Sequence, residues 1–157
     1  PIYHTNWLTG MSAKLGLLTV EAEDEFLIAR LLHLMQVHQA DYINTFRALT
    51  LETHDATALF SSEDFSRWTE KWQARLGRQQ ASKASAMQVM KHCNPSIIPR
   101  NHRVEEALAA AVEKGDYSVM EQLLHLLSNP FAYTSEQEEY AKLPDTATTP
   151  YRTFCGT

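Results

Sequence analysis

The sequence has few cysteines and no long apolar run, and both shortages exclude classes of protein. Two cysteines, Cys93 and Cys155, are too few to staple a domain of 157 residues with disulfides, so we expect a reducing compartment. No apolar stretch approaches the roughly 20 residues that cross a bilayer. The N-terminal residues also lack the basic and apolar regions of a secretory signal. We therefore expect no membrane partner.

Clustered positive charge is also missing. The formal net charge is -5, and the 14 Lys and Arg residues are scattered among 19 acids. A surface that binds nucleic acid needs clustered cations to neutralise phosphates. We expect no nucleic-acid partner.

The motifs of common active sites are absent as well. There is no G-x-x-x-x-G-K-[ST] loop, no G-x-G-x-x-G, no H-E-x-x-H and no G-x-S-x-G. The cysteines lie too far apart in sequence to form a Cys-x-x-Cys zinc pair. The seven histidines are dispersed, and His33 and His38 are five residues apart, which places them on different helix faces. We expect no catalytic residue, cofactor-binding residue or metal ligand in this chain.

Apolar residues at helical spacing are what the sequence has in abundance. They recur almost everywhere, whereas period-2 runs rich in Val, Ile and Thr are lacking. This pattern predicts an all-α fold, an irregular multi-helix bundle with an extended C-terminal tail. With their caps, the predicted helices run from about residue 5 to 15, 19 to 39, 41 to 49, 61 to 80, 82 to 92, 101 to 114 and 116 to 128.

Residues with special backbone preferences set the predicted boundaries. Gly16 and Gly115 suit the left-handed position that closes a helix. Asn94-Pro95 and Pro99 force an extended break, because residues before proline avoid the helical region. The predicted N-caps are Thr19, Asp41, Ser61 or Ser62, Ser82, Asn101 and Asp116.

Two apolar stripes are predicted to face the core. Phe65, Trp68, Trp72 and Leu76 are three and four residues apart, and we interpret this stripe as core rather than as a partner-binding face. The stripe of the helix after the proline break is also expected to point inward, and it consists of Val104, Leu108, Ala111 and Val112.

Acidic clusters have a simple interpretation. The run between Glu21 and Glu25 is placed where a helix N-terminus favours negative charge. The group Glu136, Glu138 and Glu139 is interpreted as a solvated loop rather than as paired acid and base.

The two cysteines differ in their expected surroundings. Cys93 is followed by apolar Ile97 and Ile98 and is interpreted as a small buried hydrophobe. Cys155 has only two residues after it, so its thiol is expected to be accessible. The residues alone leave open whether Cys155 has a role. We divide the chain into a helical part, residues 1–128, and an irregular tail, residues 129–157.

Several short segments occur in an order that carries a family resemblance. They are Trp7-Leu8, residues 13–17 (AKLGL), Ala40-Asp41-Tyr42, residues 45–49 (TFRAL), Asn94-Pro95, Pro99-Arg100-Asn101, residues 114–117 (KGDY) and residues 126–131 (LLSNPF). In this order and spacing, the chain resembles the C-terminal part of selenoprotein O family proteins, which are kinase-like protein adenylyltransferases.

The resemblance implies a kinase-like parent that binds ATP and magnesium and transfers AMP to hydroxyl groups of protein substrates. The family's catalytic and nucleotide-binding residues lie N-terminal to the matched region, so none is assigned here. The family has selenocysteine or cysteine third from the C-terminus, and Cys155 holds that place. The resemblance therefore makes Cys155 a redox candidate, and it implies a bacterial, cytoplasmic protein.

Three hypotheses follow for function. The first is a helical C-terminal part that braces the missing N-terminal kinase-like lobe, and it predicts an exposed apolar face where that lobe would sit. The start Pro1-Ile2-Tyr3-His4, without an initiator Met, fits this expectation of a larger protein. The second is a free-standing helical module that binds a partner helix and has no catalytic parent. The third, an autonomous enzyme, has little support from the motifs.

Overall fold

A computed structural model describes residues 2–53 and 57–144, and in them the chain is all-α, as predicted. These residues contain eight helices and no strand. The helices are α1 (Ile2–Lys14), α2 (Asp24–Val37), α3 (Tyr42–Leu51), α4 (Glu63–Arg78), α5 (Lys83–Cys93), α6 (Asn101–Lys114), α7 (Ser118–Leu127) and α8 (Ser135–Tyr140).

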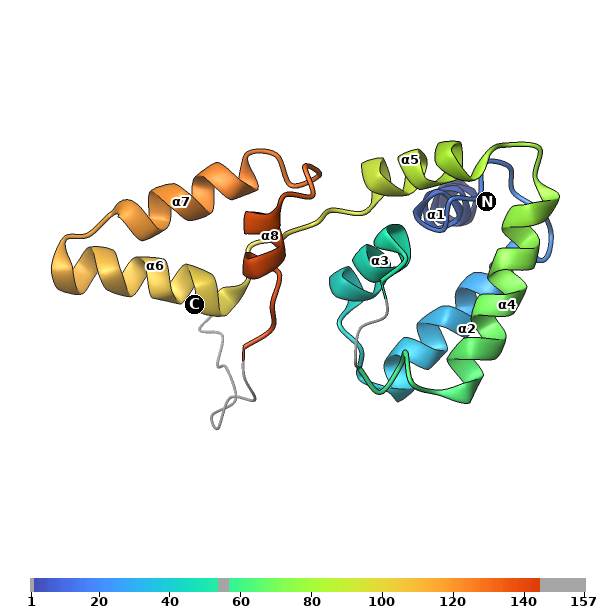
Figure 1. The fold of residues 1–157 in the computed structure, drawn as a ribbon, viewed down its shortest axis with the longest axis horizontal. Helices are drawn as coiled ribbons and strands as arrows, with labels where there is room; N and C mark the ends of the chain where they lie inside the picture. Colours follow the sequence, from blue (N-terminus) through green and yellow to red (C-terminus); the bar gives the residue numbers. More distant parts are fainter. Residues whose placement is uncertain (1, 54–56, 145–157) are drawn as a thin grey trace.

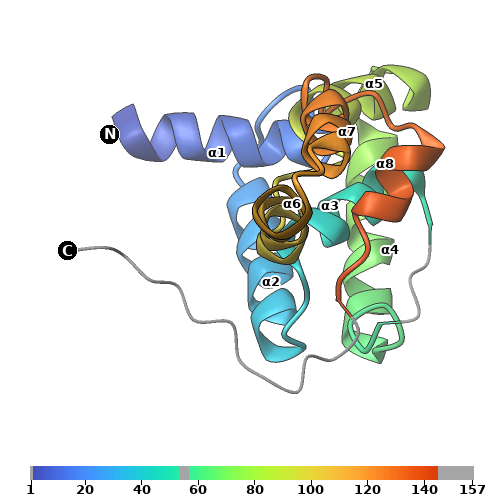
Figure 2. The ribbon, with the colours of Figure 1, turned by 90° about the vertical axis from the view of Figure 1, so that its left-hand side faces the viewer.

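The helices form two groups joined by an extended segment, residues 94–100 (Figure 1). We call α1 to α5 the five-helix unit and α6 to α8 the hairpin unit. Pro95 and Pro99 lie in the extended segment, so the predicted proline break is confirmed. The N-terminal part of α1 projects away from the five-helix unit (Figure 2), and Ile2 and Tyr3 are exposed there.

Most helix boundaries follow from the predicted caps. The Asp41 side chain accepts a hydrogen bond from the Asn44 backbone N–H at 2.8 Å, and Ser62 and Ser82 cap α4 and α5 in the same way. Gly16 and Gly115 have φ angles of 73° and 65°, which confirms both as left-handed closing residues.

Three predicted caps are wrong: Thr19, Asn101 and Asp116. The residue before α7 is Tyr117 rather than Asp116, and it makes no side-chain capping bond. Helix α2 begins at Asp24 after Glu23, which makes no side-chain capping bond. The Thr19 carbonyl oxygen instead accepts a hydrogen bond from Arg75 at 2.7 Å. Asn101 is the first residue of α6 rather than its cap. At the start of α2 a tertiary contact fixes the boundary, and at the start of α6 the proline break fixes it. Local side-chain capping does not fix either boundary.

The hydrophobic core lies in the five-helix unit. The predicted aromatic stripe on α4 is confirmed as core, because Phe65, Trp68 and Trp72 are buried and Leu76 packs against them. The indole N–H groups donate to backbone carbonyls, Trp68 to Leu27 and Trp72 to Leu15, each at 2.9 Å. Each tryptophan thus fills space in the core and also ties α4 to a neighbouring segment.

The hairpin unit pairs α6 with α7, as predicted, but the inward stripe of α6 is only half right, because Val104 and Ala111 are half-buried whereas Leu108 and Val112 are exposed. Leu108 is 47% exposed and Val112 is 83% exposed, whereas Ala107 is buried. Helix α6 packs against α7 through the neighbouring stripe that contains Ala107. Since no other helix covers the Leu108 and Val112 side, the larger apolar residues face outward (Figure 1).

The tail prediction needs a correction. We expected no regular structure after residue 128, yet Ser135–Tyr140 forms α8. Thr134 and Gln137 exchange hydrogen bonds in a capping box, and the Gln137 side chain donates to the carbonyls of Leu126 and Asn129 at 3.0 and 2.7 Å. Glu136, Glu138 and Glu139 are exposed on this helix rather than on a loop.

Candidate functional site

The redox candidate Cys155 lies outside the described residues, so its proposed role stays a prediction. Cys93, predicted to be a small buried hydrophobe, is a free cysteine that is half-buried. It ends α5, where its carbonyl oxygen accepts a hydrogen bond from Lys14 Nζ at 2.9 Å. Cys93 therefore belongs to a structural contact at a helix C-terminus.

A polar network surrounds this helix end. Burial lowers the pKa of the Lys14 ammonium, and negative charge at Cys93 acts in the opposite direction. Asn94 is fully buried, and its amide donates to the Lys14 carbonyl at 2.8 Å and to Thr50 Oγ1 at 2.9 Å. The network supplies hydrogen-bond partners to the buried Asn94 amide and to the Cys93 carbonyl, where the five-helix unit meets the extended segment. These hydrogen bonds hold the end of α1 against the end of α5.

Further polar contacts connect the two units. Arg100 donates to both carboxylate oxygens of Asp41, at 2.6 and 2.7 Å. The Tyr133 hydroxyl donates to the Asn94 carbonyl, and the Ser96 N–H donates to the Pro130 carbonyl at 2.7 Å. Burial raises the pKa of the Tyr133 hydroxyl, so it stays a protonated donor at neutral pH. We call these contacts the polar junction.

The acidic run at the start of α2 contains a buried ion pair that the sequence reading missed. Asp24 has no exposed surface, and Arg75 Nε contacts its Oδ1 at 2.8 Å while Nη2 contacts Oδ2 at 3.1 Å. Arg75 is itself only 3% exposed. A signal was available, because Arg75 lies three residues after Trp72 and seven after Trp68, on the buried face of α4.

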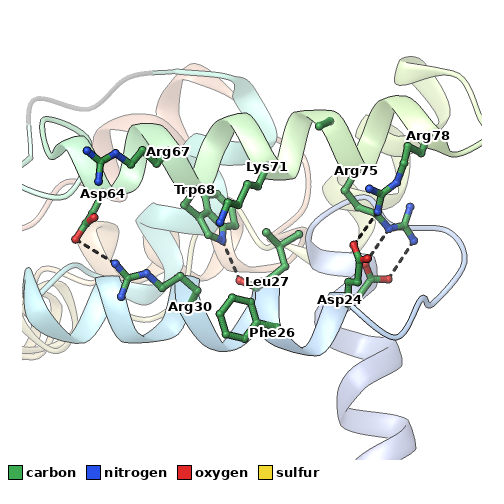
Figure 3. A pocket seen from close by; sticks show the side chains of 12 residues that line it. Asp24, Phe26, Leu27, Arg30, Asp64, Arg67, Trp68, Lys71, Arg75 and Arg78 are labelled. Carbon is green, nitrogen blue, oxygen red and sulfur yellow. Dashed lines mark hydrogen bonds and ion pairs between the residues drawn. The ribbon is translucent and has the colours of Figure 1, made fainter.

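A groove of about 670 Å³ runs between α2 and α4 on the outside of the five-helix unit (Figure 3). Its apolar lining includes Leu27, Trp68 and Phe26, and Phe26 is 73% exposed. Basic side chains line its length on α4: Arg67, Lys71, Arg75 and Arg78. The groove combines aromatic and cationic surface, which suits a partner with the opposite charge.

The hairpin unit carries exposed apolar side chains on both helices of its pair. Leu108 and Val112 on α6 are one turn apart, and Leu124 on α7 is 60% exposed. We call these three residues the hairpin apolar surface. Its exposure fits the sequence-based expectation of an uncovered apolar face.

In residues 2–53 and 57–144, neither a metal-binding cluster nor a membrane-spanning helix is found. No group of three or more His, Cys, Asp or Glu side chains there is arranged to hold a metal ion. None of the helices in these residues combines the length and apolar character needed to cross a membrane.

Eight helices and a polar junction define the described part of this chain as an all-α module. A family model described as Protein adenylyltransferase SelO matches residues 1–128. The chain therefore belongs to the SelO family, as the resemblance indicated.

Relatives extend the match over almost the whole chain. The protein nucleotidyltransferases YdiU of Alkaliphilus metalliredigens and Clostridium botulinum are 58% and 57% identical over 156 residues. The protein of the same name from Bacillus thuringiensis is 58% identical over 155 residues. Each alignment covers 99% of this chain and 32% of the relative. The chain spans about a third of the length of these relatives.

Proposed function

We propose that this chain is the helical structural and regulatory part of a protein adenylyltransferase. The full-length form would transfer AMP from ATP to Ser, Thr or Tyr hydroxyls of protein substrates, with magnesium as the metal and pyrophosphate as the leaving group. Family membership and the relatives' designation as protein nucleotidyltransferases support this proposal. The residues that bind ATP and magnesium would belong to the other two thirds of such a protein.

The observation that carries the proposal is the hairpin apolar surface. Leu108, Val112 and Leu124 leave apolar area in water, although isolated helix pairs gain most of their stability by burying such faces. A kinase-like lobe packed on α6 and α7 would cover this area. The hairpin unit would then hold the lobe in a fixed position relative to the five-helix unit through the polar junction.

Cys155 is the proposed regulatory residue. Its thiol would form a disulfide with a cysteine of the lobe, and the two electrons and two protons released would pass to a protein disulfide acting as oxidant. A bonded tail would hold one position near the catalytic lobe, and reduction would release it.

The experiment is adenylyl transfer from labelled ATP with magnesium. It compares this chain, the full-length parent, and the parent with Cys155→Ser, each under reducing and oxidising conditions. We expect activity in the parent alone, with a redox dependence that Cys155→Ser removes. Labelling by this chain alone would refute the proposal, and an inactive parent would favour a free-standing interaction module.

A second pair of variants tests the hairpin apolar surface directly. In the parent, Val112→Asp should lower activity at least tenfold, because the buried charge would separate the lobe from α6. Gln122→Asp introduces the same charge at an exposed polar position of α7 and should leave activity within twofold. Equal activities for the two variants would show that the lobe does not cover Val112.

The alternative, a free-standing helical interaction module, has one observation in its favour. The five-helix unit has a core of its own and a groove on its outer side, as an independent binding module would. An active full-length parent decides against this alternative.

A further inference from the structure

The groove between α2 and α4 is elongated. The two helices are antiparallel, because Arg30 on α2 pairs with Asp64 at the start of α4, whereas Asp24 pairs with Arg75 near its end (Figure 3). Arg78 lies 14 positions after Asp64, a rise of about 21 Å along the helix at 1.5 Å per residue. A ligand that uses the whole groove is therefore rod-shaped and about four helical turns long.

The charge of the groove differs from that of the chain. Five cations line it, Arg30 and the four of α4, against the three acids Glu23, Asp24 and Asp64, which gives a net charge of +2. The chain as a whole has a net charge of -5. The α4 cations at positions 67, 71, 75 and 78 fall at helical spacing, so they form one stripe along the groove.

Part of this positive charge is available to a ligand. Lys71 has no ion-pair partner among the described residues, and Arg67 pairs only with Glu63, one turn before it on the same exposed face. The Arg30 and Asp64 side chains are 38% and 53% exposed, so their pair is weak and easily exchanged. Arg75 and Arg78 contribute less, because Arg75 pairs with Asp24 and Glu21 and Arg78 pairs with Glu21 and Glu23.

The apolar lining supplies the second half of the recognition surface. Phe26 projects from α2 beside Leu27 (Figure 3), and it is 73% exposed although its neighbours Leu27 and Trp68 are buried. A phenylalanine that is exposed next to a row of cations favours a partner with an apolar stripe flanked by acids. Nucleic acid does not fit, because three acidic side chains line the same groove.

We propose that the α2–α4 groove binds an acidic amphipathic helix of about four turns. Apolar residues of that helix at i, i+3 or i+4, and i+7 pack on Phe26 and Leu27, and its flanking carboxylates pair with Arg67 and Lys71. The proposal is independent of adenylyl transfer, because it concerns helix recognition by the five-helix unit alone.

The test uses the whole chain and a fluorescein-labelled 18-residue peptide with Leu at i, i+4, i+7 and i+11 and Glu on both flanks. Binding is followed by fluorescence anisotropy. Two matched peptides carry Gln in place of Glu, or Ser in place of Leu. The acidic peptide should bind at least tenfold more tightly than either, and its affinity should fall severalfold between 50 and 300 mM salt.

Three variants place the binding site. Arg67→Glu combined with Lys71→Glu, and separately Phe26→Ser, should each weaken binding at least tenfold. Lys114→Glu, at an exposed position of α6, should leave it within twofold. Circular dichroism checks that each variant is folded. We expect each to fold, because the changed side chains are exposed.

Other outcomes overturn the proposal. Failure of the acidic peptide to bind, or binding unaffected by the Arg67 and Lys71 changes, removes the groove as its site. Equal binding of the Ser-substituted peptide means charge attraction without helix docking. Concentration-dependent dimerisation that Lys71→Glu abolishes, seen by analytical ultracentrifugation, assigns the groove to a second copy of this chain instead.

Discussion

The five-helix unit and the hairpin unit are both helical, but they bury very different amounts of apolar surface. Fifteen buried residues between Met11 and Met90 form one cluster in the first. The hairpin unit buries only a few apolar side chains, among them Ala107, Leu123 and Leu126. Helix formation alone therefore says little about independent stability, because short helices depend on tertiary packing.

The connection between the two units is polar, unlike the apolar core of the five-helix unit. The polar junction relies on directional hydrogen bonds and an ion pair, such as the bidentate contact of Arg100 with Asp41. Directional contacts fix an orientation well but add modest net stability, about 1 kcal/mol for a typical hydrogen bond. The first unit thus acts as a scaffold, and the second is oriented on it with part of its apolar surface exposed.

The largest expected effect comes from breaking the buried ion pair of the five-helix unit. Arg75→Ala leaves the Asp24 carboxylate without a counter-ion at a position with no exposed surface. Breaking such a pair costs about 3–5 kcal/mol of unfolding free energy. Urea unfolding followed by circular dichroism measures this loss.

Arg67→Ala is the matched control on the same helix. Arg67 pairs with Glu63 at the surface, where both side chains are mostly exposed, and such pairs contribute about 0–1 kcal/mol. If the two variants lose equal stability, Asp24 is hydrated in solution and the contrast between buried and exposed pairs fails.

A pair of glycine substitutions compares the two units directly. Gly16 and Gly115 both close helices with positive φ, so alanine at either costs about 1–2 kcal/mol of backbone strain. A Cβ on Gly16 would also lie 3.1 Å from Met90 Sδ and 3.2 Å from Ala86 Cβ, whereas nothing lies within 4 Å at Gly115. Overpacking adds about 1–3 kcal/mol at Gly16 alone.

Thermal or urea unfolding of Gly16→Ala and Gly115→Ala measures the difference. A larger loss for Gly16→Ala is expected, since it meets both strain and a packed core. Equal losses would mean that α5 moves away from Gly16 at little cost, which contradicts a tightly packed five-helix unit.

Sequence periodicity was sufficient for the fold class and for the approximate positions of α1 to α7, but not for their division into two units, because residues 1–128 were predicted as one helical part. The caps Asp41, Ser62 and Ser82 act locally, through hydrogen bonds to residues three positions on, so the residue types alone predicted them. Thr19 failed because α2 begins where Asp24 meets Arg75, a contact between residues 51 positions apart. Local rules contain no information about such a contact.

In the hairpin unit, the sequence pattern predicted the helices α6 and α7 but not which side of α6 faces its partner. Periodicity identified the stripe with Leu108 and Val112, and we predicted that these larger apolar residues face the core. They are exposed. With α7 as its packing partner, α6 uses the stripe of Ala107, and the direction of a stripe is a tertiary property. Helix α8 was missed because six residues give too little periodicity, although its capping box was readable in Thr134 and Gln137.

The smallest effect that still separates the two units concerns Asp41. Burial raises the pKa of its carboxyl group, but the hydrogen bonds from Arg100 and from the N–H groups of Asn44 and Ile43 outweigh burial, so the net pKa lies below 3.8. A carboxyl group with a lowered folded-state pKa adds stability above its unfolded pKa. That stability is lost as the pH falls through the folded-state value.

Asp41→Asn keeps a good capping side chain for α3 but removes the charge that holds Arg100. The expected loss of unfolding free energy is about 1–2 kcal/mol at pH 7, and it shrinks toward zero as the pH falls below about 4. Urea unfolding at pH 7, 5 and 3.5 measures it. Asp64→Asn, at an exposed pair, should change the unfolding free energy by less than about 1 kcal/mol.

Hydrogen exchange shows where the loss falls. Because Arg100 precedes α6, losing its contact should speed amide exchange in α6 and α8 while α2 and α4 stay protected. Faster exchange throughout the five-helix unit would mean that Asp41 acts chiefly as a cap inside that unit. The contacts that orient the hairpin unit would then be the other hydrogen bonds of the polar junction, from Tyr133 to the Asn94 carbonyl and from the Ser96 N–H to the Pro130 carbonyl.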